Sequence, residues 1–419
     1  MAAVWFWLSN LVGLAGLVAG LRPNTRWPGR VLGWLAVAGA AWGLIASGKV
    51  TGLQQFLNGV FLGSIYALIA LGYTMVYGVL RLINFAHGEV FMIGAYIAWF
   101  ALAAYQRQPT TAVAVALLAA MVGCAALGLL VERVAYRPLR RAPRLAALIT
   151  AIGVSLLLQN LSLLIFSAKP KTIPPVVSSD TLKAVYTATG LTVNAPALVT
   201  VAAAFALMLG LRFFVATTKL GRAMRAVSED REAAQLMGIN VDFVIAATFA
   251  IGSALAGAGG VLYGLRYQVI KADMGVLPGL KAFVAAVLGG IGSIQGAMVG
   301  AFLIGVVEVA VAGVSVSPQQ IATGSFLALL LLAFWRLSQH WVAGLPRTPQ
   351  ATRLLALGWA LLAAACGVVA RCATLPLKLS PERSVSGSTF QDAAVFAILV
   401  VILIVKPTGL MGRFAPEKV

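Results

Sequence analysis

Long uninterrupted apolar runs recur along this chain and limit what it can fold into. Residues 54–80 and 241–267 are two such runs, and each is long enough to cross a bilayer as a helix. Of the 419 residues, 61% are hydrophobic and only 10% are charged, whereas soluble domains are about a quarter charged. A soluble fold would lack a polar surface, and a transmembrane β-barrel needs alternating rather than continuous apolar sequence. The sequence therefore predicts an all-α polytopic membrane protein.

We expect about 11 transmembrane helices plus one re-entrant hairpin, on the basis of run length. The hairpin is assigned to residues 279–312, where a glycine-rich break follows an apolar stretch of about ten residues, or about 15 Å of helix. That length is about half of the hydrocarbon core. The expected full spans are residues 1–20, 31–48, 54–80, 85–105, 110–131, 145–167, 196–216, 241–267, 320–336, 353–372 and 389–405.

The basic residues of the chain lie where they set its orientation in the membrane. The net charge is +19, but most of the 31 Lys and Arg residues fall in short loops, among them 132–144 and 217–240, or near the C-terminus. Cytoplasmic loops of membrane proteins carry such an excess. We therefore expect an outside N-terminus, a cytoplasmic C-terminus, the lipid bilayer as the surroundings, and no nucleic-acid partner. Because the first apolar run has no basic residue before it, we interpret it as a span rather than a cleaved signal peptide.

The sequence shows no constellation that would carry catalysis or hold a metal. Cys124, Cys366 and Cys372 match no metal-ligand spacing, and His87 and His340 are far apart. The glycine-rich stretch 289–296 lacks the Lys-Ser/Thr pair of a phosphate loop. We expect no catalytic residue, no metal site and no resident cofactor, so the chain is not expected to be an enzyme.

Polar side chains interrupt the apolar sequence around residues 55–89. Tyrosines and amides recur at three- and four-residue multiples along 54–80, which places them on one helix face. A charged group at mid-membrane costs about 2.5–3.5 kcal/mol on insertion scales and is expected to face the bundle or water. The candidate residues of a path for a small zwitterion are Asn58, Tyr66, Tyr73, Tyr77, Asn84, His87 and Glu89.

A purely structural role is the alternative for these polar groups. Glu89 could pair with Arg81 or with a neighbouring helix and fix the packing of the bundle. Glu308 and Asp392 are open to the same two interpretations.

The loop 217–240 contains a short polar helix. Ser228 can cap it, Glu229 and Asp230 suit its N-terminal end, and Gly238 can end it. About nine residues are too few to span a membrane, so this helix is either an ordinary connector or a surface that seats in a cytoplasmic partner, with Ala233, Leu236 and Met237 on one face. The candidate coupling residues are Arg225, Ser228, Glu229, Asp230, Glu232, Ala233, Ala234 and Gly238.

Several stretches resemble the permease subunits of ABC importers for branched-chain amino acids, of the LivH type. EAAQLMG (232–238) is similar to the EAA loop by which such permeases contact their ATPases, and residues 53–96, LGGIGSIQGAMVGAFLIGVVE (288–308) and VKPTGLMG (405–412) resemble the family closely. The resemblance implies a permease core at 51–312 and a last core helix with a cytoplasmic tail at 388–419. Residues 1–50 and 313–387 depart from the family pattern, and we expect each to add two helices.

The resemblance also implies a function and partners. The chain is expected to be the permease subunit of an importer in the inner membrane, with ATP and Mg²⁺ held by separate ATP-binding cassette ATPase subunits. A second permease subunit of the LivM type and an extracytoplasmic solute-binding protein are the other expected partners. Urea, short amides and aromatic acids remain alternative solutes. The alternative of another class is a self-contained secondary transporter or channel, in which Glu89, Glu308 and Asp392 would relay protons.

Overall fold

The computed structural model describes the central part of the chain and a few segments near its C-terminus. The described residues are 51–82, 84–104, 109–140, 142–173, 195–313, 315–316, 385–386, 388, 391–405 and 409–411. The expected N-terminal extension 1–50, the expected spans 320–336 and 353–372, and most of the loop after residue 173 lie outside the described residues.

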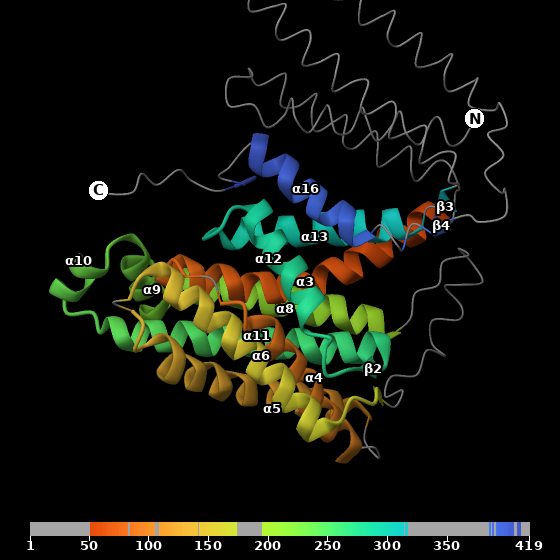
Figure 1. The fold of residues 1–419 in the computed structure, drawn as a ribbon, viewed down its shortest axis with the longest axis horizontal. Helices are drawn as coiled ribbons and strands as arrows, with labels where there is room; N and C mark the ends of the chain where they lie inside the picture. Colours follow the sequence, from red (N-terminus) through yellow and green to blue (C-terminus); the bar gives the residue numbers. More distant parts are fainter. Residues whose placement is uncertain are drawn as a thin grey trace, which may run out of the picture. The chain divides into compact units, whose positions relative to one another are not determined.

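Within the described residues, seven helices are long and apolar enough to cross a membrane (Figure 1). Six of these helices follow the spans expected from the sequence to within a few residues. The seventh, at Ile294–Ala312, lies in the segment 279–312 that was expected to be a hairpin. These seven are α3 (Thr51–Leu80), α4 (His87–Ala104), α5 (Pro109–Val131), α6 (Arg144–Phe166), α8 (Ala195–Thr217), α11 (Val241–Tyr267) and α13 (Ile294–Ala312). A single π-helical turn, η1 (Glu132–Tyr136), extends α5. The chain is thus an all-α polytopic membrane protein, and the total of 11 helices stays a prediction.

Helix α3 forms the centre of the bundle, and its residues 61–76 are all buried. Glycines bring its neighbours close, as small residues do in membrane bundles. A Cβ added at Gly72 would lie 2.8 Å from the main-chain oxygen of Gly252 on α11, and one added at Gly94 on α4 would lie 2.5 Å from Cα of Gly257. Larger side chains at these contacts would therefore separate α11 from α3 and α4.

The glycine-rich break lies where the sequence predicts it, between α12 (Val276–Gly289) and α13. Gly290 and Gly292 both have positive φ, a conformation that glycine adopts without strain. Helix α13 then runs antiparallel along α3, with Gly78 beside Gly292 at one end and Gly59 against Val306 at the other. The break therefore lies level with the C-terminal end of α3. A re-entrant path across a bilayer stays a prediction.

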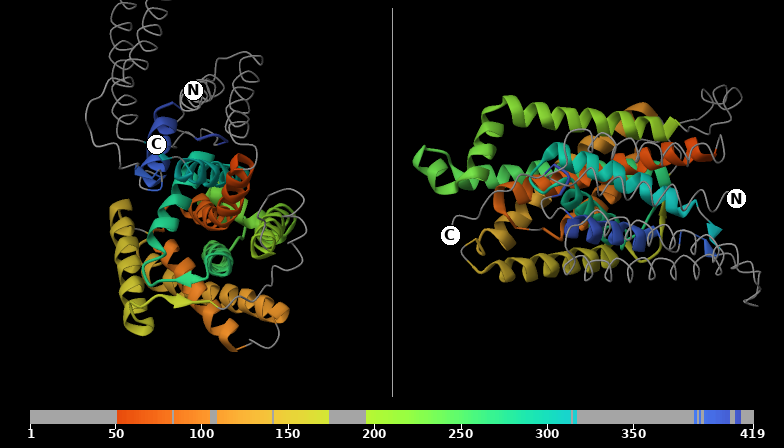
Figure 2. Two further views of the ribbon diagram at one scale, coloured as in Figure 1. Left: turned by 90° about the vertical axis from the view of Figure 1, so that its right-hand side faces the viewer. Right: turned by 90° about the horizontal axis from the view of Figure 1, so that it is seen from above.

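Short elements complete the described structure. Helices α9 (Lys219–Glu229) and α10 (Arg231–Leu236) lie at the end of the bundle opposite β2 (Val269–Ile270) (Figure 1). Strand β2 pairs antiparallel with β1 (Lys171–Thr172). Figure 2 shows α6 at the edge of the bundle.

The last described helix, α16 (Gln391–Val405), is followed by a tail that binds α12. The amides of Leu410 and Met411 donate to the main-chain oxygens of Leu288 and Gly289, at 2.8 and 2.9 Å. This contact joins the C-terminal end of α12 to the chain's C-terminal segment.

Residues Val311–Gln391 form a separate compact unit. It is described mainly at β3 (Ser315–Val316) and β4 (Val385–Ser386), which pair antiparallel. The expected insertion at 313–387 therefore stays a prediction.

Candidate functional site

The polar residues of α3 divide into two groups rather than forming one row. Asn58 is half-buried and accepts a 3.3 Å hydrogen bond from Gln54, one turn earlier. The buried Tyr66 hydroxyl donates to Oε2 of Glu308 on α13, at 3.0 Å. Tyr73 and Tyr77, nearer the C-terminal end of α3, face α12 instead. The structure does not bring all four together.

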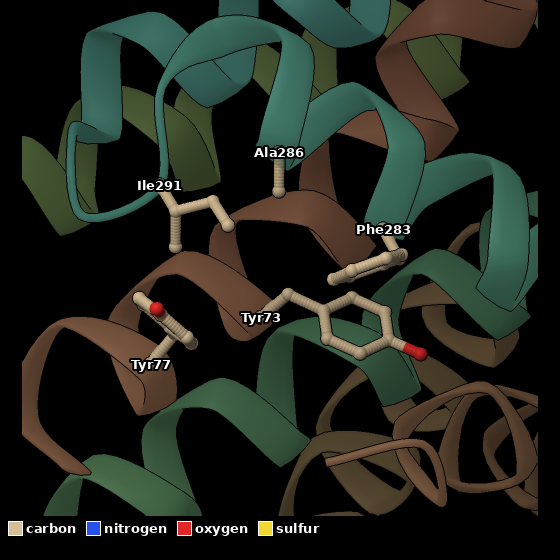
Figure 3. A pocket seen from close by; sticks show the side chains of 5 residues that line it. All are labelled: Tyr73, Tyr77, Phe283, Ala286 and Ile291. Atoms are coloured by element: carbon tan, nitrogen blue, oxygen red, sulfur yellow. The ribbon is translucent and has the colours of Figure 1, made fainter. Parts of the chain in front are cut away.

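A small pocket lies between α3 and the α12–α13 turn (Figure 3). Its walls are Tyr73, Tyr77, Phe283, Ala286 and Ile291. The space in which the centre of a water molecule fits is about 10 Å³. That space is about the minimum for one water. Because the Tyr73 hydroxyl points away from Tyr77 and Ile291 (Figure 3), the pocket is aromatic and apolar. A solute larger than water needs a rearrangement of these side chains.

Asn84 makes two internal contacts just before α4 begins. Its Oδ1 accepts from the amide of Ala86 at 3.1 Å and from the hydroxyl of Tyr136 at 3.0 Å. The first bond shapes the turn into α4, and the second ties that turn to the end of α5 through η1. These contacts give Asn84 a structural role, and its expected place on a solute path stays a prediction.

His87 opens α4 inside the bundle. Its ring lies 4.8 Å from the Tyr73 ring in an edge-to-face arrangement. A Cβ at Gly72 would come 2.2 Å from His87 Nε2. Since Gly72 precedes the end of α3 by about two turns, or about 12 Å, the start of α4 lies within the bundle and not at its surface.

Glu89 lies in the first turn of α4 and is 1% exposed. Its Oε1 accepts a long 3.4 Å hydrogen bond from Ser155 on α6, and its Oε2 has no hydrogen-bond partner among the described residues. Arg81 is exposed, and in the described part of the chain it forms no ion pair with Glu89. The alternative that Arg81 neutralises Glu89 is therefore wrong, and the contact with a neighbouring helix comes from Ser155.

An ion cluster with a buried lysine joins α12, α13 and α16, and the sequence reasoning missed this cation. Nζ of Lys281 lies 2.6 Å from Oε1 of Glu308 and 2.6 Å from Oδ1 of Asp392. Lys281 is 4% and Glu308 6% exposed. The signal in the sequence is a single lysine inside an otherwise apolar stretch. Glu308 and Asp392 thus have a structural partner, as one of the two interpretations expected.

The expected cap of the short polar helix was placed two residues too early. Ser228 lies inside α9, where its hydroxyl donates to the main-chain oxygen of Arg225 at 2.7 Å. Asp230 is the cap: its Oδ1 accepts from the amides of Glu232 and Ala233, at 3.0 and 3.1 Å. Helix α10 accordingly has 6 residues instead of about nine.

The expected start was wrong because the preceding residues form a helix of their own. Thr218 caps α9 through the amide of Gly221, at 3.0 Å, and apolar residues such as Met224 bury one face of that helix. Arg225 extends from α9 to the main-chain oxygens of Val215 and Ala216, near the end of α8. Its guanidinium thereby satisfies carbonyls that a helix end leaves free.

Helix α10 presents an apolar end away from the bundle. Leu236 is 88% and Met237 83% exposed, and Ala233 is exposed beside them, as are Glu229 and Glu232. Ala234 is the buried member of this helix. Gly238 ends it with φ +80°, as predicted. Exposed apolar side chains of this size, rimmed by charges, are typical of a protein contact surface.

Arg231 connects α10 to the helix that carries the tyrosines. Its Nη2 donates to the main-chain oxygen of Val79, at 2.9 Å. Nearby, Arg140 pairs with Glu132 of η1 and Asp242 of α11. Spacing along the chain gives no signal for the bonds of Arg231 to Val79 and of Arg140 to Asp242, because these partners are more than about a hundred residues apart in sequence.

A family model and several known proteins match this chain. The model of the family "Branched-chain amino acid transport system / permease component" matches residues 55–335. The high-affinity branched-chain amino acid transport system permease protein BraD of Pseudomonas aeruginosa is 47% identical over 61% of this chain and 85% of its own length. The corresponding permease LivH of Salmonella typhimurium is 44% identical over 67% of this chain and 92% of its own. No solved structure gives a significant match.

Proposed function

Because the chain belongs to the branched-chain amino acid transport permease family, we propose that it is the transmembrane subunit of an ATP-driven importer in the inner membrane. It translocates branched-chain amino acids or a similar small polar solute. ATP and Mg²⁺ belong to separate ATPase subunits. A second permease of the LivM type and an extracytoplasmic binding protein complete the assembly.

The exposed end of α10 is the observation that supports the ATP-driven part of this proposal. Leu236 and Met237 together present apolar surface away from the bundle, beside the charges of Glu229 and Glu232. A capped helix held by α9 is rigid enough to transmit a displacement. ATPase closure moves this helix, and alternating access follows as the bundle reorients around α3 and the α12–α13 turn.

The experiment is solute-stimulated ATP hydrolysis by the reconstituted complex. Leucine, isoleucine and valine, each presented on the binding protein, should raise hydrolysis above the basal rate, whereas urea, acetamide and phenylacetate should not. Stimulation by one of the latter three alone would assign a different solute. A permease that transports without ATPase subunits would instead be the secondary transporter.

A further inference from the structure

We propose that Glu89 is the subsite for the solute's ammonium group, so that the transported class is amines with a positive charge and not neutral amides or urea. This inference rests on the proposed function and deepens it. Its first support is chemical: Oε2 of Glu89 is a buried acceptor without a partner in the part of the chain that the structure describes. Burying a carboxylate with an unmade hydrogen bond is unfavourable unless a ligand completes the bond.

A second oxygen without a partner lies on the same face of α4. The Tyr96 hydroxyl is buried and has no hydrogen-bond partner within the described segments. Tyr96 follows Glu89 by two helical turns, which places both on one side of the helix. The Tyr96 ring stacks on Phe166 of α6, with centroids 4.1 Å apart, just as Glu89 touches Ser155 of α6. The α4 face toward α6 therefore carries both unsatisfied oxygens.

The segment before α12 approaches this face with a glycine, and it carries one exposed acidic residue, Asp273, and one exposed basic residue, Lys271. A Cβ at Gly275 would lie 2.5 Å from the main-chain oxygen of Gly88 and 2.8 Å from Oε2 of Glu89, so a larger residue here would clash with both. Asp273, two residues earlier, is exposed and acts electrostatically on both Glu89 and Tyr96. Glu89 has no cationic partner among the described residues, whereas Glu308 has Lys281. A buried carboxylate without a cationic partner favours binding of a cation, and an amino acid supplies one with three hydrogen-bond donors.

Tyr73 separates this subsite from the pocket near the α12–α13 turn. Its ring forms one wall of the pocket and packs on His87, two residues before Glu89. A solute whose ammonium binds Glu89 thus meets Tyr73 on its way toward the pocket, where an apolar side chain would contact Phe283. The pocket as it stands has room for about one water, so the apolar side chain of the solute enters it only after Tyr73 and Phe283 rearrange.

The test is uptake of labelled leucine into proteoliposomes that contain the whole complex, at saturating binding protein. Glu89→Gln keeps the shape of the side chain and removes its charge. We expect uptake to fall at least about tenfold at unchanged assembly, because a charge-assisted hydrogen bond is lost. Asn160→Ala, an exposed change on α6, is the matched control and should transport like the wild type.

Tyr96→Phe keeps the inference testable if Glu89→Gln does not assemble. It removes only the unpartnered hydroxyl, and we expect a several-fold loss of uptake. Wild-type uptake should also persist when choline replaces sodium and potassium, because the bound cation is the solute's own. Dependence of uptake on sodium or potassium overturns the assignment.

The outcomes separate this inference from the proposed function. If the wild type takes up leucine and Glu89→Gln or Tyr96→Phe does so at the same rate, the ammonium subsite is overturned and the importer assignment stands. If the wild type takes up urea or acetamide but no leucine, the ammonium subsite is overturned and the importer carries a different solute. If uptake of leucine proceeds without the ATPase subunits, the importer assignment is overturned.

Discussion

Nη2 of Arg231 on α10 donates a 2.9 Å hydrogen bond to the main-chain oxygen of Val79, in the last turn of α3. The exposed α10 helix and the central helix of the bundle are therefore joined by one side chain. Burial lowers the pKa of the Arg231 guanidinium, and nearby Arg140 and Arg81 lower it further, but an arginine stays protonated at physiological pH. The bond is thus a charged one at the C-terminal end of a helix, where a cation is favoured.

Removing this bond should uncouple ATP hydrolysis from transport. A hydrogen bond to a charged group contributes about 1.5–3 kcal/mol, so Arg231→Ala should loosen α10 from α3 without unfolding the bundle. We expect less leucine transported per ATP hydrolysed, measured in proteoliposomes. Arg222→Ala, an exposed change on α9, is the control. An unchanged ratio in Arg231→Ala would show that motion reaches α3 by another route.

The exposed apolar end of α10 should be needed for ATPase binding and not for folding. Leu236 is 88% exposed, so Leu236→Glu removes little buried surface and should leave permease stability within about 0.5 kcal/mol. It should nevertheless abolish co-purification of the ATPase subunits. Gln235→Glu, also exposed, adds the same charge next to it and should be tolerated better. Normal ATPase recovery with Leu236→Glu would place the contact elsewhere.

The Lys281 cluster should tolerate the loss of a whole ion pair better than the loss of one partner. Lys281→Met leaves Glu308 buried without its cation, which costs about 3–5 kcal/mol. The double change Lys281→Met with Glu308→Gln removes both charges and should recover most of that loss, although Asp392 then loses its partner. The check is the amount of monodisperse protein after heating. Equal losses for the single and double variants would contradict a structural ion pair.

The orientation expected from the loop charges predicts which residues an impermeant thiol reagent reaches. A cysteine at exposed Lys169, after α6, should be labelled from outside intact cells, and one at exposed Gln235 on α10 should not. The background needs Cys124, Cys366 and Cys372 replaced by serine or alanine. The reversed labelling pattern would invert the topology.

Run length and glycine placement predicted the helices well, because both depend on neighbouring residues in the sequence. The apolar runs located α3, α4 and α11, and Gly238 marked the end of α10. Contacts between distant residues were not predictable in this way. Lys281 finds Glu308 and Asp392 on two other helices, and only the fold shows that Arg81 stays away from Glu89.

The cap of α10 shows a second limit. Ser228 and Asp230 are both good N-cap residues, so the local sequence alone does not choose between them. The apolar face of α9, with Met224 and Val227 buried, extends that helix past Ser228 and leaves the cap to Asp230. Tertiary burial thus decided a boundary that local propensity left open.

The most direct measurement of the central claim is leucine uptake by proteoliposomes that hold the complete complex, with ATP or with a non-hydrolysable analogue inside. We predict accumulation with ATP that persists when an ionophore collapses the proton gradient, and none with the analogue. Accumulation that needs the proton gradient and proceeds without ATP hydrolysis would contradict the account and identify a secondary transporter.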